Sequence, residues 1–530
     1  MEGAEKMNFE KRNINLDSHW KITEAPETQE IIIKPACTDC DLRILINELD
    51  SLVNIGKGFA SVTDTDCFFG NVNRRDSRWF VLLYDRTNRR SVFVENRHGG
   101  VFHWENDGLH CPDGKELRII SGKDPVQLLQ KLDFPSRGPV RKLWGWNSWD
   151  YYYDTITEED VIENIQAIQK DPILKANLDY IVIDDGWESM PGDWIPNHRF
   201  HGDLSRVVKA ITDVGMIPGI WTAPFMISSR SPIGRFHAEM LCKKNDGFVH
   251  FEPLADYGRV GMPDLRREDA RQFIRDTYAR LYETGFRFFK LDFINMLTHA
   301  PGMSPEMVDL GLNLIRESIG EDAVLLGCGM TPGCGIGTCD TMRVIPDIST
   351  YWSCILVAAR ALSAYWFLHG KVCTNDPDFL IVRNRKTSLD EHFNPYHSFI
   401  PYQSFVTRGG TPIDSIHEVQ VGASLIILSG GNIMLGDRIS RLNSIGMDIV
   451  HTVLKYNSGE TAIPYDLGGI GIPEQWENSK LYAVFNFYDT TRTITLKKEV
   501  VGFEVWQKKE ITIAGSLTLP PRSVLLVEKE

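Results

Sequence analysis

The feature that most constrains the fold is an alternation of short apolar runs with helical segments across the middle of the chain. Eight strand-like runs occur there, at 142–146, 179–185, 216–222, 286–293, 323–329, 341–347, 371–376 and 424–430. Helical patterns lie between them, as in 158–169, 267–283 and 305–319. Parallel strands buried on both faces read as continuous apolar runs, and eight strands joined by helices match a TIM barrel. An open doubly wound sheet is the alternative, but it usually has a Gly-rich loop after its first strand, and LWGWNSWDYYY has none.

Strand-like runs separated by turn residues flank this central region on both sides. The N-terminal ones are 31–35, 42–47, 79–85, 91–96 and 116–121, and the C-terminal ones are KLYAVFNFY, TRTITL, GFEVWQK and SVLLVEK. Short strands punctuated by Gly, Asn and Asp are typical of β-sandwiches. We therefore predict an α/β protein with an N-terminal β-sandwich at 1–137, a catalytic (β/α)8 barrel at 138–440 and a small C-terminal β-sandwich at 441–530.

Composition excludes several classes of partner. The chain has 57 Lys and Arg against 71 Asp and Glu, a formal charge of −14. This balance argues against nucleic acids and anionic membranes, which bind clustered positive charge. No apolar run reaches the roughly 18 residues of a membrane span, and MEGAEKMNFEKRN has no apolar stretch, so we expect a cytoplasmic protein. The ten cysteines fit a reducing compartment, and the lone Cys37-Thr-Asp-Cys40 motif lacks the second pair of a zinc site.

Charged and aromatic side chains gather at the predicted strand ends. Active sites of TIM barrels lie at the carboxyl ends of the strands, so these residues are expected to meet. They are Asp184 and Asp185 on the second strand, Lys290 and Asp292 on the fourth, Cys328 on the fifth, Arg343 and Asp347 on the sixth, and Trp149 and Trp221 near the first and third. Carboxylates accept hydrogen bonds from sugar hydroxyls, and aromatic rings pack on the C–H face of a sugar.

A pair of carboxylates on different strands is also what glycoside cleavage requires. Metal-dependent hydrolysis is the rival chemistry, but it prefers histidine ligands, and the only close pair, His198 and His201, lies in a loop. We predict neither a metal nor another cofactor. Each residue also has a structural interpretation. Lys290 and Asp292 could form a buried ion pair, Arg343 and Asp347 a routine i,i+4 pair, and Asp184-Asp185 a helix cap.

Taken together, the motifs resemble glycoside hydrolase family 36, the clan D α-galactosidase family related to family 27 and to raffinose synthases. The similarity runs from Leu143 through Gly436. It rests on six segments in order: Gly145-Trp146-Asn147-Ser148-Trp149, Ile183-Asp184-Asp185-Gly186-Trp187, Lys290-Leu291-Asp292, Asp340-Thr341-Met342-Arg343-Val344-Ile345-Pro346-Asp347, Asn375-Asp376-Pro377-Asp378 and Ser429-Gly430-Gly431-Asn432.

The resemblance implies a role for each candidate residue. Asp292 would be the catalytic nucleophile and Asp347 the general acid/base of a retaining double displacement. Asp184 and Asp185 would accept hydrogen bonds from the 4- and 6-hydroxyls of the sugar, while Lys290 and Arg343 would contact ring hydroxyls. Trp149 and Trp221 would form apolar walls, with Cys328 lining the floor. The implied activity is exo-acting α-galactosidase hydrolysis.

The chain departs from the family pattern in the loop after the fifth strand. Relatives have a Cys-x-x-Gly-x-Gly-Arg segment beside the 2-position of the sugar, whereas residues 328–339 read CGMTPGCGIGTC. Terminal α-linked galactose and N-acetylgalactosamine both stay open, on an oligosaccharide or a glycoconjugate. An α-galactosyl transferase using the same residues, and a non-catalytic carbohydrate-binding barrel, are the alternative functions. The resemblance leaves the linkage and any homo-oligomer undecided.

Overall fold

The structure is a computed structural model that describes 116–131, 133–138, 141–254, 257–329, 333–390, 411–465 and 471–530, together with strand segments between 14 and 111. The Cys37-x-x-Cys40 motif lies outside the described residues. The chain divides into two compact units. The first comprises 1–135, 331–336 and 466–470, and the second comprises 136–330, 337–465 and 471–530.

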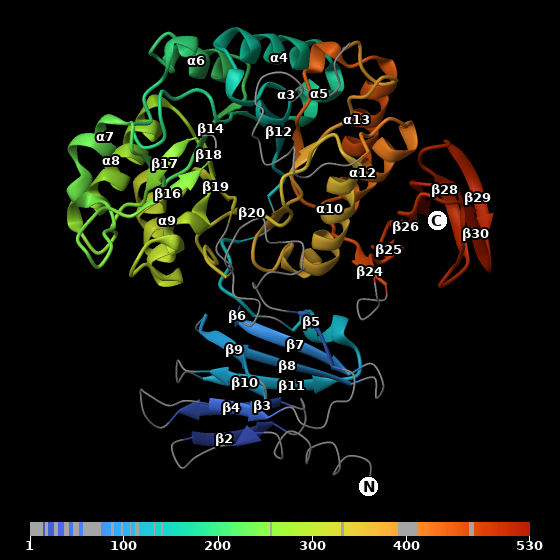
Figure 1. The fold of residues 1–530 in the computed structure, drawn as a ribbon. Coiled ribbons are helices and arrows are strands. Elements are labelled where there is room, and N and C mark those ends of the chain that lie inside the picture. The colour runs from blue at the N-terminus through green and yellow to red at the C-terminus, as the bar shows by residue number, and fades with distance from the viewer. Residues whose placement is uncertain are drawn as a thin grey trace. The chain divides into compact units, whose positions relative to one another are not determined.

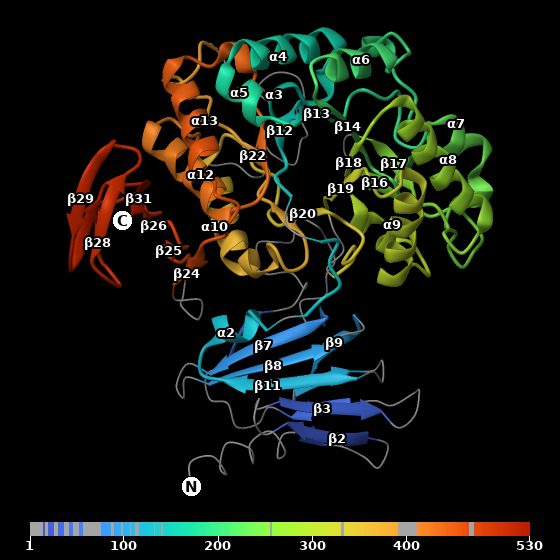
Figure 2. The ribbon, with the colours of Figure 1, turned by 180° about the vertical axis from the view of Figure 1, so that it is seen from behind.

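The first unit contains two antiparallel sheets (Figures 1 and 2). One has the order β1-β4-β10-β9-β6, with strands at Ile14–Asn15, Leu42–Leu45, Gly108–Cys111, Val101–Glu105 and Asp76–Arg78. The other has the order β2-β3-β11-β8-β7-β5, with strands at Trp20–Ala25, Glu30–Pro35, Leu117–Gly122, Arg90–Asn96, Phe80–Asp85 and Leu52–Gly56. Helix α2 (Pro125–Leu129) follows, capped by the Asp124 side chain. The five predicted N-terminal runs all contain strands.

The second unit is built around a curled parallel sheet of nine strands. Its order is β21-β20-β19-β18-β14-β13-β12-β23-β22. In chain order the strands are β12 (Trp144–Asn147), β13 (Tyr180–Ile183), β14 (Ile217–Thr222), β18 (Phe288–Leu291), β19 (Val324–Gly327), β20 (Thr341–Arg343), β21 (Thr374–Asp376), β22 (Phe379–Leu380) and β23 (Ile433–Leu435). The two edge strands, β21 and β22, are separated only by Pro377 and Asp378, so the chain joins the two ends of the sheet. This is the TIM-type architecture that the alternation predicts.

Helices lie around the outside of the curled sheet (Figure 1). They are α3 (Trp149–Tyr152), α4 (Glu158–Lys170), α5 (Pro172–Asn177), α6 (Ser205–Asp213), α8 (Glu268–Thr284), α9 (Pro305–Ile319), α10 (Trp352–Tyr365), α12 (Ile416–Ser429) and α13 (Ser444–Tyr456). The predicted helices at 158–169, 267–283 and 305–319 are confirmed within one residue at each end. Each packs an apolar stripe inward, such as Val161, Ile165 and Ile168 of α4.

The prediction of a strand at 424–430 is wrong, because this segment is the second half of helix α12. The Ser415 hydroxyl accepts from the Glu418 backbone N–H, and the Glu418 carboxylate accepts from the Ser415 backbone N–H, which starts the helix. Nearly all of α12 is buried, so its sequence is apolar on every side and lacks a helical period. The strand that follows this helix is β23 instead, after Gly430 ends the helix at φ 65°.

The C-terminal residues form a six-stranded sheet of order β24-β25-β26-β31-β28-β29 and a two-stranded sheet β27-β30. In chain order the strands are β24 (Ile463–Pro464), β25 (Gln475–Glu477), β26 (Leu481–Asn486), β27 (Arg492–Thr495), β28 (Val500–Glu504), β29 (Lys509–Ile513), β30 (Ser516–Leu519) and β31 (Ser523–Lys529). Tyr482 and Val527 of the larger sheet share one buried cluster with Ile494 and Leu519 of the smaller sheet. The segment 441–530 is not wholly β as predicted, because it begins with α13, which packs on α12.

A small three-stranded sheet is inserted between β14 and α8. It has the order β15-β17-β16, with strands at Ile227–Ser228, Gly258–Gly261 and Phe251–Leu254, and it is accompanied by α7 (Pro232–Phe236). No helix among the described residues is long and apolar enough to cross a membrane.

Candidate active site

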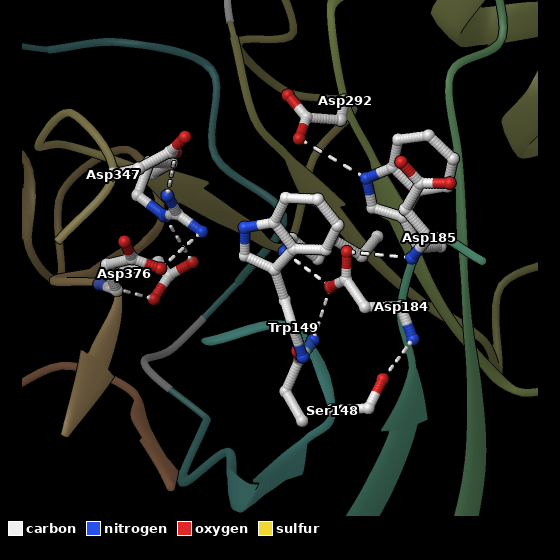
Figure 3. A network of polar contacts seen from close by, with 12 residues as sticks. Ser148, Trp149, Asp184, Asp185, Asp292, Asp347 and Asp376 are labelled. Atoms are coloured by element: carbon white, nitrogen blue, oxygen red, sulfur yellow. Dashed lines mark hydrogen bonds and ion pairs between the residues drawn. The ribbon is translucent and has the colours of Figure 1, made fainter. Parts of the chain in front are cut away.

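The predicted site residues come together at the carboxyl ends of the parallel strands (Figure 3). Asp184 and Asp185 directly follow β13, Asp292 follows β18, and Asp376 ends β21. Since all these strands run in one direction, their carboxyl ends lie at one end of the curled sheet. The strand order thus gathers carboxylates that are nearly 200 positions apart in the sequence.

Asp292 is held by a side-chain donor and by the backbone. The Trp221 indole N–H donates to Asp292 Oδ2 over 3.2 Å, and the Phe293 backbone N–H donates to Oδ1 over 2.7 Å. The carboxylate remains partly accessible. Removal from bulk water and the negative charge of Asp347 raise the pKa of Asp292, whereas Lys290 and Arg343 oppose this shift. Asp292 is therefore an oriented carboxylate within electrostatic reach of a second one.

Trp221, predicted to be an apolar wall of the site, holds the Asp292 carboxylate. Its side chain is almost fully buried, and its only polar group fixes Asp292. Gly329, after β19, lies on the other side of this carboxylate. A Cβ at that position would stand 3.1 Å from Asp292 Oδ1 and 2.9 Å from the Phe293 nitrogen. Phe293 itself has a φ of 50°, an uncommon value for an aromatic residue, so the backbone turns sharply where the carboxylate is presented.

Arg343 on β20 organises the second group of carboxylates. Its guanidinium contacts Asp347 at 3.1 Å, Asp376 at 3.2 Å and Asp378 at 2.6 Å. Asp376 and Asp378 are fully buried, whereas the Asp347 side chain is 31% exposed. Burial lowers the pKa of Arg343, but the three carboxylates outweigh it and raise that pKa well above its ordinary value. Among these three acids, Asp347 is the one that can reach a bound molecule.

Asp184 lies at the centre of a buried network. It accepts from Lys290 Nζ at 2.6 Å, from Asn147 Nδ2 at 2.7 Å and from the Asp185 backbone N–H at 3.0 Å. The Ser148 hydroxyl accepts from the Asp184 backbone N–H at 2.9 Å. Although burial lowers the pKa of Lys290, the charge of Asp184 raises it overall, so the ammonium stays charged. The ion pair expected between Lys290 and Asp292 is instead formed with Asp184.

Asp185 has a different environment from its neighbour. Tyr257, in the turn between β16 and β17, donates its hydroxyl to Asp185 Oδ2. The Glu188 carboxyl is also close, and Glu188 Oε2 accepts from the Gly186 backbone N–H at 3.3 Å. Burial, followed by the charge of Glu188, raises the pKa of Asp185 well above its ordinary value.

Trp149 and Cys328 complete the predicted set. The Trp149 ring lies between the Asp347–Asp376 group and Asp184 in Figure 3 and is partly exposed, as an apolar sugar-binding face would be. Its backbone N–H donates to Asn147 Oδ1 at 2.8 Å. Cys328 is buried after β19, and burial raises the pKa of its thiol. Arg343, Asp292 and Lys290 all act on Cys328 electrostatically, which places it among them.

Several site residues are absent from the sequence-based prediction. Asp376 and Asp378 stand in a recognised strand end, but nothing in the sequence links them to Arg343. A further buried cation, Arg383, contacts Asp437 at 2.7 Å and Asp150 at 2.5 Å. Tyr257 and Glu188 also belong to the site. Asp150 and Asp437 lie within three residues of the ends of β12 and β23, which was an available signal. Tyr257 lies in the turn of the inserted sheet, and the sequence gives no signal for it.

Within the described ranges, no three His, Cys, Asp or Glu side chains are grouped so as to hold a metal ion. His201 Nε2 lies 3.5 Å from Glu159 Oε1, and this pair is outside the carboxylate cluster. The described charged residues at this end of the sheet are paired carboxylates and the cations that fix them.

Comparison with known proteins relates the chain to α-galactosidases. No protein-family model matches it. The chain is 26% identical over 143 residues to the α-galactosidase AgaA of Geobacillus stearothermophilus, covering 26% of this chain and 18% of that protein. It is 23% identical over 259 residues to a probable α-galactosidase of Dictyostelium discoideum, covering 48% and 57%. The matched segments thus span less than two thirds of either relative.

Solved structures show the same fold. An α-galactosidase from Thermus thermophilus, in complex with p-nitrophenyl α-D-galactopyranoside, has a TM-score of 0.61 at 18% identity, covering 83% of this chain and 91% of that one. A family 27 β-L-arabinopyranosidase from Geobacillus stearothermophilus has a TM-score of 0.56 at 15% identity, covering 74% and 98%. The chain is homologous to α-galactosidases, and its fold is shared by members of more than one glycoside hydrolase family.

Proposed function

We propose that the protein is a retaining, exo-acting α-galactosidase-type glycoside hydrolase of the family 36 kind, acting on terminal α-linked sugars of the galactose series. One observation carries this proposal. Among the acids at the strand ends, Asp292 and Asp347 are the two partly exposed ones, and each is oriented by fixed donors. Cleavage of a glycosidic bond needs two such groups on opposite sides of the anomeric centre.

Asp292 serves as the nucleophile in this mechanism. Trp221 and the Phe293 backbone N–H leave its carboxylate in one orientation, and Lys290 and Arg343 favour its ionised form. It attacks the anomeric carbon, and the bond to the leaving oxygen breaks. A covalent glycosyl-enzyme results, as in other retaining enzymes.

Asp347 serves as the general acid and then as the general base. It gives its proton to the leaving oxygen and later removes one from the water that hydrolyses the intermediate. Arg343 holds Asp347 at 3.1 Å, while the buried Asp376 and Asp378 balance the charge of the guanidinium. Trp149 packs on the sugar, Cys328 lines the floor, and Asp184 and Asp185 accept from its hydroxyls.

The substitution Asp292→Ala tests the proposal. We expect turnover of p-nitrophenyl α-galactoside and its N-acetylgalactosamine analogue to fall by at least about 1,000-fold, because no other carboxylate can form the intermediate. Asp213→Ala, on an exposed acid of α6 paired with Lys209, is the control and should retain normal turnover. Undiminished activity of a folded Asp292→Ala variant would contradict the proposal. Added sugar acceptors would reveal a transferase by the appearance of new oligosaccharides.

A further inference from the structure

The inserted sheet contributes one residue to the site. Strands β16 and β17 pair antiparallel from Phe251 to Gly261, and Tyr257 lies in the turn that joins them. Its backbone N–H donates to the Leu254 carbonyl at 3.1 Å. Its ring meets the ring of Phe293 edge-on, with centroids 6.0 Å apart, directly beside the candidate nucleophile. Tyr257 is thus fixed by backbone and ring contacts, with its hydroxyl directed at Asp185.

This hydroxyl occupies an acceptor that a sugar would otherwise use. Tyr257 donates to Asp185 Oδ2, and the Asp185 carboxyl is also crowded by the buried Glu188. Asp184 differs, because Lys290 and Asn147 hold it as a charged acceptor. The two neighbouring acids are therefore not equivalent. The charge of Asp184 is balanced by Lys290 and its carboxylate is fixed, whereas Asp185 already accepts a hydrogen bond from the Tyr257 hydroxyl.

We propose that Tyr257 is a specificity-determining residue that adapts the site to pyranosides lacking the C6 hydroxymethyl group. This inference rests on the proposed function, in which Asp184 and Asp185 receive the 4- and 6-hydroxyls. A β-L-arabinopyranoside has the ring configuration of an α-D-galactopyranoside but no hydroxymethyl group, so it needs one acceptor fewer. The Tyr257 hydroxyl supplies the hydrogen bond that the missing 6-hydroxyl would have made to Asp185.

A galactoside meets two obstacles at the same place. Its 6-hydroxyl must displace the Tyr257 hydroxyl from Asp185 or remain unpaired inside the site. An unpaired buried polar group weakens binding by about 10- to 100-fold. The preference should therefore be expressed mainly in KM, because the contact lies away from the bond that is broken.

The test compares kcat/KM for p-nitrophenyl β-L-arabinopyranoside with kcat/KM for p-nitrophenyl α-D-galactopyranoside. We expect the full-length protein to favour the arabinopyranoside by about tenfold or more. Tyr257→Phe keeps the ring contact with Phe293 but removes the hydroxyl, so it should lower this ratio by about tenfold, chiefly through a lower KM for the galactoside. Tyr282 lies on helix α8, outside the site, and its hydroxyl donates to Asp322, so Tyr282→Phe should leave the ratio unchanged.

The possible failures can be told apart. A wild-type preference for the galactoside, or an unchanged ratio in Tyr257→Phe, overturns this inference while galactoside cleavage still supports the proposed function. If neither of these glycosides nor the N-acetylgalactosamine analogue is turned over, both this inference and the proposed function are overturned. If Tyr257→Phe does not fold, the wild-type ratio alone decides, because a ratio below one contradicts the inference.

Discussion

At the residue scale, the site contains two accessible carboxylates and two cations that are held by buried carboxylates. Lys290 is committed to Asp184, and Arg343 is shared between Asp347 and two fully buried acids. Buried cations of this kind are stable only when their donors are matched. Because the buried acids neutralise the cations, Asp292 and Asp347 remain available to a substrate.

Gly329 permits the close approach of two strand ends at Asp292. Its φ is 54°, and an added Cβ would lie 2.9 Å from the Phe293 nitrogen. We expect Gly329→Ala to lower kcat by at least about tenfold, because the carboxylate must shift from its productive position. Gly459→Ala is the matched control, since Gly459 has a φ of 78° but nothing within 4 Å of an added Cβ. Equal kcat in the two variants would contradict this role for Gly329.

The candidate acids were predictable from the sequence because they stand at the ends of short strand-like runs. Asp184, Asp292 and Asp347 could be placed at strand ends without knowledge of any contact. Partners that depend on closure of the sheet could not be predicted in this way. Arg383 meets Asp150 and Asp437 only because β22 and β12 both flank β23.

At the element scale, the largest difference between prediction and structure concerns α12. Its residues are buried on nearly every side, so hydrophobic periodicity gave no indication of a helix. The decisive local signal is the capping box of Ser415 and Glu418. Tyr257 was also not predictable from the strand–helix repeat, because it belongs to a hairpin inserted between β14 and α8.

The stability that Glu418 gives to the start of helix α12 depends on pH. Burial raises its pKa, but Arg522 and the Asp414 and Ser415 backbone N–H groups lower that pKa overall below 4.5. A carboxyl whose pKa is lower in the folded state than in the unfolded state stabilises the folded protein at pH values above its unfolded-state pKa. This contribution disappears as the pH falls through the folded-state pKa. We expect Glu418→Gln to destabilise the protein by about 1–2 kcal/mol at pH 7.

The same variant should lose this deficit in acid. Denaturant unfolding at pH 7 and near pH 3 would measure it, with Glu317→Gln on helix α9 as the control. A deficit that stays constant, or grows, as pH falls through this range would contradict a charged capping role for Glu418.

At the scale of the whole molecule, the C-terminal sheet is joined to the barrel helices by specific contacts. Trp506 Nε1 donates to the buried Ser424 hydroxyl of α12 at 3.0 Å, and Lys508 pairs with Asp448 of α13 at 2.8 Å. Strand β31 also packs along α12. These contacts place 471–530 in the same compact unit as the barrel. The domain boundary at 440/441 stays a prediction.

This arrangement predicts that the C-terminal sheet and the barrel unfold together. Thermal unfolding followed by tryptophan fluorescence and by loss of activity should give coincident transitions. Trp506→Phe should lower the free energy of unfolding by about 1 kcal/mol, since Ser424 loses its donor. Tyr488→Phe, at an exposed position, should not. An earlier fluorescence transition that leaves activity intact would show independent unfolding of the sheet.

Our principal proposal is that Asp292 attacks the anomeric carbon and that Asp347, on the opposite face of the sugar, then activates the water that releases the sugar from Asp292. The most direct test is proton NMR of the first product formed from the faster-cleaved aryl glycoside, recorded before mutarotation. We expect a free sugar with the anomeric configuration of the substrate, because two displacements restore it. A first product with the opposite configuration would contradict it, since that result requires a single displacement by water.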